Sequence, residues 1–405
     1  MINGADTVWV IVATALVMIM TPTLAFFYGG LVRKKNVLSI MMQCMVILAV
    51  ISIQWVLFGY SLAFGPDKGG LIGGLEWAFL HGVGLQPLEG QTIPHQLFVC
   101  FQMMFAVITP ALMVGAFAER IKFSGFLFFI VLWSTFIYDP MAHWVWAPGG
   151  WLYDKGVLDF AGGTVIHITA GVSALVMSIL IGKRNGGVSL PSPHNLPFAV
   201  LGAAFLWFGW FGFNAGSALS VKGQTVSAFI NTNTAAAAAV LMWMILDWFI
   251  HKTPTVLGVI TGAVAGLVAV TPAAGFVTPM ASIIIGGGGS ALGFVFVTYV
   301  KNKFGYDDTL DVFGVHGMAG IWGALATGLF AAKDIGGTDG LFYGNQSQLT
   351  VQAISVVVAV LFSAVGTYII YKISDALIGM RVEDREEKIG LDLTQHHEAG
   401  YTLMD

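Results

Sequence analysis

The chain has 405 residues, of which only 10% are charged and 57% are hydrophobic, and its formal net charge is −4. Soluble domains carry about 25% charged residues, so too few charges are present here to cover a water-exposed surface. Composition therefore excludes an ordinary soluble protein and favours a membrane protein, and the small negative charge gives no indication of nucleic-acid binding.

Apolar runs of roughly 20 residues, the length that crosses the hydrocarbon core of a bilayer, recur along most of the chain. They predict an all-α membrane protein with about eleven transmembrane helices, and residues 1–380 form the predicted transmembrane domain. In chain order the predicted spans are 8–31, 37–64, 96–117, 123–144, 164–181, 198–217, 225–250, 255–272, 278–300, 312–330 and 351–377. Residues 381–405 follow as a predicted cytoplasmic regulatory tail.

Basic residues are distributed unequally between the two ends of these spans. On one side the loops hold Lys68, Lys155, Lys222 and Lys333. On the other side the loops and the tail hold Arg33, Lys34, Lys35, Arg120, Lys122, Lys183, Arg184, Lys252, Lys301, Lys303, Arg381, Arg385 and Lys388. Because Lys and Arg concentrate on the cytoplasmic side, we expect an outside N-terminus, a cytoplasmic C-terminus and a multi-pass protein of the cell inner (plasma) membrane.

One short sequence element occurs twice, as HITAG from His167 in the fifth span and as HGMAG from His316 in the tenth. An aspartate precedes each copy, Asp159 in the first case and Asp311 in the second. The copies are five spans apart, so the second crosses the membrane in the opposite direction, as in inverted-topology repeats. We therefore expect a five-plus-five inverted repeat with an extra C-terminal helix. A chance match of so short a pattern is the alternative.

His167 and His316 are also the clearest ionisable residues inside predicted spans, where such groups are costly and usually face a cavity or each other. A histidine that only donates to a backbone carbonyl is the structural alternative for each one. Their matched positions favour a pair facing a pore. Asp159 has two compatible interpretations, an N-cap for the fifth span and a negative field that favours a cation outside.

Aromatic residues gather near the outer ends of the third, fourth and sixth spans. Phe101 and Phe105 share a face of the third span, and Trp146 stands at the outer end of the fourth. In the sixth span, Trp210 and Phe213 share a face with the hydroxyl residue Ser217. Aromatic residues at this depth commonly pack or form an interface belt. The functional alternative is a cage in which aromatic faces and a hydroxyl bind a small cation without trapping it as a carboxylate would.

Other polar and glycine-rich features carry no chemistry of their own. Cys44 and Cys100 lie in apolar runs, and the cysteines and histidines lack metal-ligand spacing, so we expect no metal or cofactor. The run from Gly286 to Gly289 lacks the residues of a phosphate loop and predicts close helix packing. Without a nucleophile–base pair or paired catalytic carboxylates, an enzyme is not expected.

Five stretches together resemble the ammonium transporter (Amt/Rh) family, in its bacterial or archaeal Amt branch. They are FYGGLVRKKNV (27–37), GAFAER (115–120), DFAGGTVIH (159–167), GWFGFNAGS (209–217) and DVFGVHG (311–317). The resemblance extends over essentially the whole chain. It implies a homotrimer with one pore per subunit and ammonium/ammonia as the substrate.

The resemblance also implies roles for individual residues. The outer ammonium site of the family corresponds to Phe105, Trp146 and Ser217, with Trp210 beside it. The phenyl gate corresponds to Phe105 and Phe213, with Phe101 one turn away. The hydrogen-bonded pore pair corresponds to His167 and His316, and the aspartate below the vestibule corresponds to Asp159. In this scheme ammonium is captured outside and deprotonated, and ammonia crosses. The residues leave open whether the proton follows.

Residues 387–401 resemble the cytoplasmic tail of the family, which packs under the trimer and takes part in control. The expected regulatory residues are Gly390, Leu391, Asp392, His396 and Tyr401. Bacterial relatives are blocked at this face by PII-type regulators, so such a regulator is an expected partner besides the lipid bilayer. Two departures are visible: His397 stands where Gly is usual, and Gly400 stands where Ala is common.

Two other functions remain as alternatives. An ammonium sensor that transports little would signal through the tail, but no long signalling domain follows the last span. A Rh-like gas channel would lack the outer cation site, and Trp146 and Ser217 oppose that interpretation.

Overall fold

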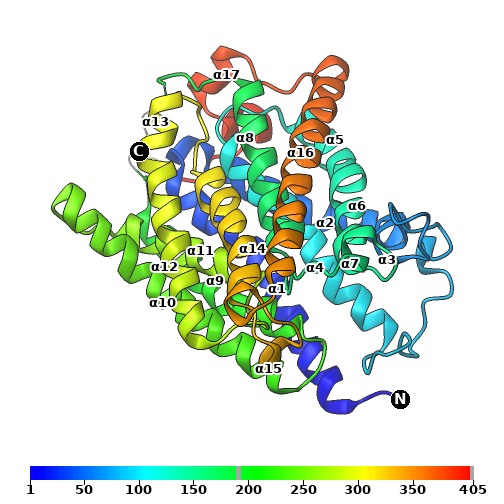
Figure 1. Ribbon diagram of the computed structural model, residues 1–405. Helices are drawn as coiled ribbons and strands as arrows, with labels where there is room; N and C mark the ends of the chain where they lie inside the picture. The colour runs from blue at the N-terminus through cyan, green and yellow to red at the C-terminus, as the bar shows by residue number, and fades with distance from the viewer. Residues whose placement is uncertain (188–192, 402–405) are drawn as a thin grey trace.

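The structure, a computed structural model, describes residues 1–187 and 193–401 (Figure 1). Residues 402–405 of the predicted tail therefore lie outside the described part. The helices are α1 (Gly4–Leu31), α2 (Val37–Gln54), α3 (Tyr60–Phe64), α4 (His95–Met113), α5 (Phe123–Trp133), α6 (Asp139–Trp146), α7 (Trp151–Asp154), α8 (Thr169–Ile181), α9 (Leu196–Gly216), α10 (Gly223–His251), α11 (Val256–Val270), α12 (Pro279–Val295), α13 (Lys301–Phe304), α14 (Ala319–Phe330), α15 (Lys333–Gly336), α16 (Gln346–Leu377), α17 (Asp384–Ile389) and α18 (Leu391–His396).

Most spans consist of one long helix or of helices joined by a π-helical turn. The π-helical turns are Trp55–Gly59, Ser134–Tyr138, Gly163–Ile168, Phe296–Val300 and Phe313–Met318. Within the described residues, ten such helical segments are long and apolar enough to cross a membrane, and α11 is a shorter apolar helix. These correspond one to one with the eleven predicted spans and confirm the all-α membrane fold.

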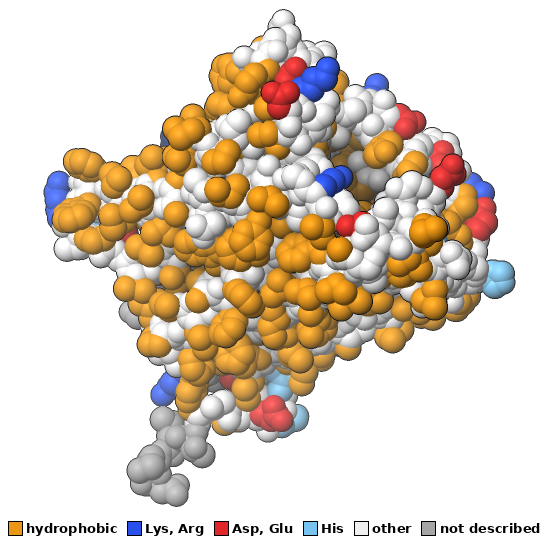
Figure 2. Space-filling view, turned by 90° about the horizontal axis from the view of Figure 1, so that it is seen from below, with side chains coloured by type: hydrophobic (Ala, Val, Ile, Leu, Met, Phe, Trp, Pro, Cys, Tyr) orange, Lys and Arg blue, Asp and Glu red, His pale blue; other side chains and the backbone are white. Residues whose placement is uncertain are grey.

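Large apolar side chains cover the outside of the bundle. Exposed examples on α10 are Phe229, Leu241, Trp248 and Phe249, and α1, α9, α12 and α16 show the same pattern. In the space-filling view, hydrophobic side chains occupy a broad area, and most charged ones lie toward its edges (Figure 2). Such a surface suits a lipid environment or contact with other helices, as the composition requires.

The two histidine elements cross each other in the middle of the bundle. Both histidines lie in π-helical turns, Gly163–Ile168 and Phe313–Met318, which continue into α8 and α14. A Cβ on Gly171 would collide with the backbone of Gly317, and a Cβ on Gly320 would lie 3.1 Å from Cβ of His167. Each copy thus places its glycine against the other copy, which confirms the inverted repeat.

The predicted match between Asp159 and Asp311 is wrong. The counterpart of Asp159 is Asp308, which precedes His316 by eight residues as Asp159 precedes His167. An Asp308 carboxylate oxygen accepts the backbone N–H of Phe313 at 2.7 Å, whereas Asp311 pairs with Lys301 at 2.6 Å. Three acidic residues stand close together before the tenth span, so sequence order alone did not identify the capping one.

The glycine run in α12 has the predicted packing role at three of its four positions. A Cβ on Gly286 would collide with the backbone of Ala235, one on Gly288 would lie 2.7 Å from the indole of Trp322, and one on Gly289 would collide with Ala269. At Gly287 the nearest atom is the terminal methyl carbon of a methionine at 3.6 Å, an ordinary contact.

We expect Gly286→Ala to destabilise the protein by about 1–3 kcal/mol, because a methyl group there forces two backbones apart. Gly287→Ala is the matched control, and we expect it to be neutral or stabilising by up to about 1 kcal/mol through helix propensity. Thermal unfolding in detergent, followed by size-exclusion chromatography, measures both. Equal midpoints for the two variants would contradict the close α10–α12 packing.

Candidate functional site

The two histidines form a buried pair near the centre of the bundle. His167 and His316 are 1% and 3% exposed, and their Nδ1 atoms lie 3.3 Å apart. Their rings are nearly parallel, with an interplanar angle of 21°. A hydrogen bond between two Nδ1 atoms needs one donor and one acceptor, so at most one Nδ1 carries a proton and the pair cannot be doubly charged.

This shared hydrogen bond gives the Nε2 atoms of the two rings different hydrogen-bonding properties. The ring that donates through Nδ1 is left with an acceptor at Nε2 if it is neutral, and the accepting ring is left with an Nε2–H donor. Nε2 of His167 is buried without a hydrogen-bond partner among the described residues. The pair therefore offers one acceptor and one donor to a small neutral molecule.

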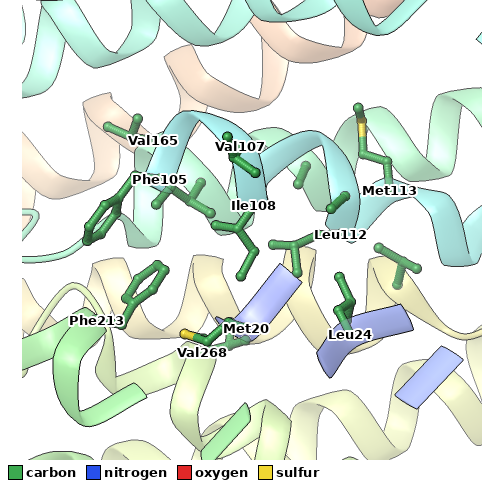
Figure 3. Close-up of a cluster of buried hydrophobic side chains, with 14 of the residues drawn as sticks. Met20, Leu24, Phe105, Val107, Ile108, Leu112, Met113, Val165, Phe213 and Val268 are labelled. Carbon is green, nitrogen blue, oxygen red and sulfur yellow. The ribbon is translucent and has the colours of Figure 1, made fainter. Parts of the chain in front are cut away.

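Aromatic rings close the pore on the outer side of the histidines. The rings of Phe105 on α4 and Phe213 on α9 face each other with centroids 4.5 Å apart (Figure 3). Trp210 packs against both Phe213 and His167, with ring centroids 5.4 and 5.6 Å away. Its indole N–H donates to the hydroxyl of Thr271 at 2.9 Å, which fixes the ring in place. Because Phe213 and His167 also stack, with ring centroids 6.1 Å apart, Trp210 lies beside the contact between these two rings.

The outer face of this closure carries the remaining aromatic residues. Trp146 is edge-on to Phe105, with ring centroids 6.1 Å apart, and Phe101 packs against Phe105 at 4.8 Å. The hydroxyl of Ser217 donates to the carbonyl oxygen of Phe213 at 2.8 Å, so its oxygen lone pairs remain free to accept. Trp146 and Ser217 are partly exposed, whereas Phe105 and Phe213 are buried.

Asp159 holds the beginning of the His167 turn. One carboxylate oxygen accepts the N–H groups of Gly162 and Gly163, and the other accepts those of Thr164 and Val165, at distances of 2.6–3.1 Å. Its own backbone carbonyl accepts the indole N–H of Trp146 at 2.9 Å. Asp159 is therefore an N-cap in the predicted sense, and it also connects the histidine turn to the outer aromatic residues.

A cavity of about 260 Å³ lies on the inner side of His316. Its lining includes residues of α1, α10, α11 and α12 together with the His316 turn. Asp247, His251 and Asp311 are the acidic and histidine side chains in that lining besides His316. Contacting aromatic rings therefore lie on one side of the histidine pair, and a wider, partly polar chamber lies on the other.

Buried charges join the inner ends of the helices. Glu119 pairs with Arg33 at 2.7 Å, and Arg184 lies between Glu119 at 3.5 Å and Asp307 at 2.8 Å. Burial by itself would raise the pKa of Glu119, but hydrogen bonds from Arg33 bring it below its usual value. Arg120 donates to four backbone carbonyls and to one hydroxyl in the same region. These residues fix the loops around the inner mouth.

The tail packs against the same loops. The N–H of Leu391 donates to the side chain of Asn36, and Asp392 accepts the N–H of Ser39, both at 2.8 Å. Gly390 has φ +118°, and a Cβ there would lie 2.7 Å from Lys35.

The end of the tail makes two further contacts. His396 packs edge-on against Phe123 with ring centroids 5.0 Å apart, and the hydroxyl of Tyr401 lies 2.9 Å from Nε2 of His194. His397 has φ +56°, a conformation that glycine adopts more readily. That conformation gives a physical reason for the Gly that is usual at this position.

The structure brings together every sequence-predicted pore residue, and the predicted tail residues form a separate group at the inner face. The sequence analysis missed Asp308, Thr271 and the inner chamber with Trp243 and Asp247. The spacing of eight residues between aspartate and histidine could have identified Asp308. The roles of Thr271, Trp243 and Asp247 depend on contacts between distant segments, for which no local pattern exists.

Comparisons with known proteins address the family and the fold of the chain. The family model described as "Ammonium Transporter Family" matches residues 8–401. The "Ammonium transporter" of Bacillus subtilis (strain 168) is 54% identical over 399 residues, which cover 98% of each chain. The crystal structure of Candida albicans Mep2 superimposes with a TM-score of 0.92 at 36% identity, covering 99% of this chain and 94% of the other.

A structure described as "Sensor Amt Protein" has a TM-score of 0.90 at 31% identity, covering 97% of this chain and 98% of the other. The match of the family model and the identity to curated relatives extend over nearly the whole chain. The chain therefore belongs to the ammonium transporter family.

We expect Asp159→Ala to lower the free energy of unfolding by at least about 2 kcal/mol, because it leaves four buried N–H groups without their acceptor. The matched control is Asp339→Ala, since Asp339 accepts a single exposed N–H, from Lys333, at 2.8 Å. That variant should lose about 1 kcal/mol or less. Thermal unfolding of the purified variants measures the difference, and an Asp159→Ala protein as stable as wild type would exclude the capping role.

Proposed function

We propose that this member of the ammonium transporter family takes up ammonium through a hydrophobic pore that ammonia crosses as a neutral molecule. The observation that carries the proposal is the order of contacts: Trp146 touches Phe105, Phe105 touches Phe213, and Phe213 stacks on His167, which is hydrogen-bonded to His316. Ser217 lies on the side of Phe213 that carries Trp146 and cannot be reached from the histidines without passing these rings. An aromatic and hydroxyl site, an apolar constriction and a polar uncharged pair are the successive environments that capture, deprotonation and conduction require.

Capture takes place at the outer aromatic residues. A cation is attracted to the ring faces of Trp146 and Phe105, and the free lone pairs of Ser217 accept an N–H from it. The hydrogen bond from Trp146 to the Asp159 carbonyl directs the indole N–H away from the cation. The Asp159 carboxylate contributes a negative field from below, in addition to its capping role.

Selectivity against potassium comes from desolvation. The contact between Phe105 and Phe213 leaves no room for a hydrated ion, and leaving water disfavours the charged form of any solute. Ammonium can release its proton, to water at the outer site or to the acceptor Nε2 of the histidine pair, and continue as ammonia once the two rings move apart. Potassium has no neutral form, so it is stopped at the same constriction.

The histidine pair then solvates ammonia. The acceptor Nε2 of one ring takes an N–H of ammonia, and the donor N–H of the other ring binds its lone pair. A proton that binds Nε2 of the donating ring, the shift of the shared proton from one Nδ1 to the other, and the loss of the proton on Nε2 of the accepting ring would together move one proton along the pair, which provides a route for proton co-transfer. Apolar side chains of α1, α4 and α11 gather next to Phe105 and Phe213 (Figure 3).

Membrane placement and assembly follow from charge and apolar surface. The excess of Lys and Arg at the tail end supports a cytoplasmic C-terminus, an outside N-terminus and residence in the cell inner membrane. The exposed apolar faces of α1, α9 and α10 suit contact with neighbouring subunits, in agreement with the homotrimer implied by the family resemblance. The tail, with its anchors on the inner loops, is the proposed regulatory segment and the surface for a PII-type regulator.

Ammonium sensing is the second candidate, because the fold closely matches that of a protein described as a sensor. A sensor would bind ammonium at the same outer residues and transmit occupancy to the tail with little flux. A Rh-like gas channel would not need the outer cation site formed by Trp146 and Ser217. Ammonium-dependent current or uptake in proteoliposomes separates a transporter from a sensor.

We expect the double variant His167→Ala, His316→Ala to reduce the ratio of ammonium to potassium transport at least about tenfold, the effect of about 1.4 kcal/mol. Without the rings, water and ions can occupy the pore. Uptake and current in proteoliposomes, with potassium as the competing ion, measure the ratio. His81→Ala, at an exposed loop position, is the control. An unchanged rate and ratio in the double variant would show that the histidines have no role in conduction.

We expect Gly390→Ala to loosen the tail, because alanine at φ +118° is strained by about 1–3 kcal/mol and meets Lys35. Trypsin should then cleave after Arg385 and Lys388 several-fold faster, since local opening exposes α17. Gly400→Ala is the control, because its new methyl group would meet only Leu38 at 3.4 Å or more. Faster cleavage combined with unchanged ammonium flux would argue against a regulatory tail.

A further inference from the structure

We propose that the chamber on the inner side of His316 is a second ammonium site, formed by Asp247 with the aromatic rings of Trp243 and Phe294. This inference rests on the proposed function and extends it to the cytoplasmic end of the pore. The chamber encloses about 260 Å³, far more than a single ammonium ion needs, so a partly hydrated cation fits.

The inverted repeat relates this chamber to the outer site. The repeat matches each span of the first half with the span five positions later. The outer site takes Phe105 from the third span, Trp146 from the fourth and Ser217 from the sixth, next to the His167 turn of the fifth. The corresponding elements are α11, α12, α1 and the His316 turn. All four line the inner chamber, and α10 completes it.

The chemistry of the lining suits a small cation. Trp243 and Phe294 meet edge to face with centroids 5.3 Å apart, which gives the chamber an aromatic corner. Asp247, one helical turn beyond Trp243, is only 3% exposed. A Cβ on Gly258 would collide with a carboxylate oxygen of Asp247 and would lie 2.7 Å from the indole nitrogen of Trp243. Glycine at this position therefore keeps the carboxylate and the indole next to the same space.

The carboxylate of Asp247 has no cationic Lys or Arg partner among the described residues. It accepts hydrogen bonds from the backbone N–H and hydroxyl of Thr255 at 3.2 and 2.7 Å, and its other oxygen lies 3.2 Å from Nδ1 of His251. Asp311, the other carboxylate in the lining, is paired with Lys301 at 2.6 Å. Asp247 is therefore the carboxylate of the lining that no Lys or Arg neutralises, and His251 is its one ionisable partner among the described residues.

His316 connects this charge to the pore. It lines the chamber while its Nδ1 faces His167, so the edge of the ring beyond that bond is available on the chamber side. Ammonia that leaves His316 enters the chamber directly. There its lone pair takes a proton from water, which gives ammonium and hydroxide, and the cation is held by Asp247 and the two rings. Cytoplasmic ammonium can fill the same site and hinder further exit.

The test uses right-side-out membrane vesicles from cells that express the full chain, so that the cytoplasmic face is inside. The initial uptake of radiolabelled methylammonium is measured with increasing internal ammonium at clamped internal pH. Wild type should be inhibited by internal ammonium. Asp247→Asn keeps an acceptor for Thr255 but removes the charge, and it should raise the half-inhibiting concentration about five- to tenfold.

Asp375→Asn is the matched control, because Asp375 is an exposed carboxylate near the inner end of α16 that does not line the chamber. It should retain wild-type inhibition. If Asp247→Asn fails to fold, Phe294→Leu removes one ring face at similar volume and should also raise the half-inhibiting concentration.

Three other outcomes of these uptake measurements would each overturn the proposed inner site. Equal inhibition in wild type and in a folded chamber variant overturns the inner site while leaving transport intact. An equal shift in Asp247→Asn and Asp375→Asn overturns it as a general charge effect. Absence of any methylammonium uptake by wild type overturns the proposed function and this inference with it.

Discussion

The contact between His167 and His316 is the interaction on which the rest of the structure depends. The Nδ1 atoms of the two imidazole rings lie 3.3 Å apart inside the bundle, a distance at which one nitrogen donates a proton to the other. This distance requires the two segments that carry the rings to cross closely. Glycines at the crossing permit that approach, since a Cβ on Gly171 would collide with Gly317. The π-helical turns direct both rings into the same space, and the two halves of the chain are positioned by this crossing.

Helices that begin with a polar turn at the end of a pore leave backbone N–H groups without partners, and lipid offers none. The chain provides aspartates for this purpose. Asp159 accepts four N–H groups, and Asp308 accepts an N–H of the second copy. The same constraint explains why other charges collect at the helix ends next to the tail. There Arg33 and Arg184 neutralise Glu119 and Asp307, and the tail packs against the same loops.

The two ends of the pore differ although the repeat relates them. On the outer side, Phe105 and Phe213 are in contact, and the polar groups available to a cation are the hydroxyl of Ser217 and carbonyl oxygens. On the inner side, the chamber is open and contains the carboxylate of Asp247. In the proposed function, the aromatic end would select the cation by desolvation, and the end with the carboxylate would retain it. The repeat thus relates two ends that differ in side chains.

The sequence by itself determined the membrane environment, the eleven spans and the inverted repeat, and it identified the histidines and aromatic residues that the structure brings together, because hydropathy and recurring motifs are local or periodic signals. It did not distinguish Asp308 from Asp311, since both precede His316 and only hydrogen-bond geometry separates a cap from an ion pair. The position of Trp210 against both Phe213 and His167, and the chamber around Trp243 and Asp247, were likewise decided by the tertiary structure. These features arise where α1, α9, α10, α11 and α12 pack together, and the contacts that define them join residues far apart in the chain.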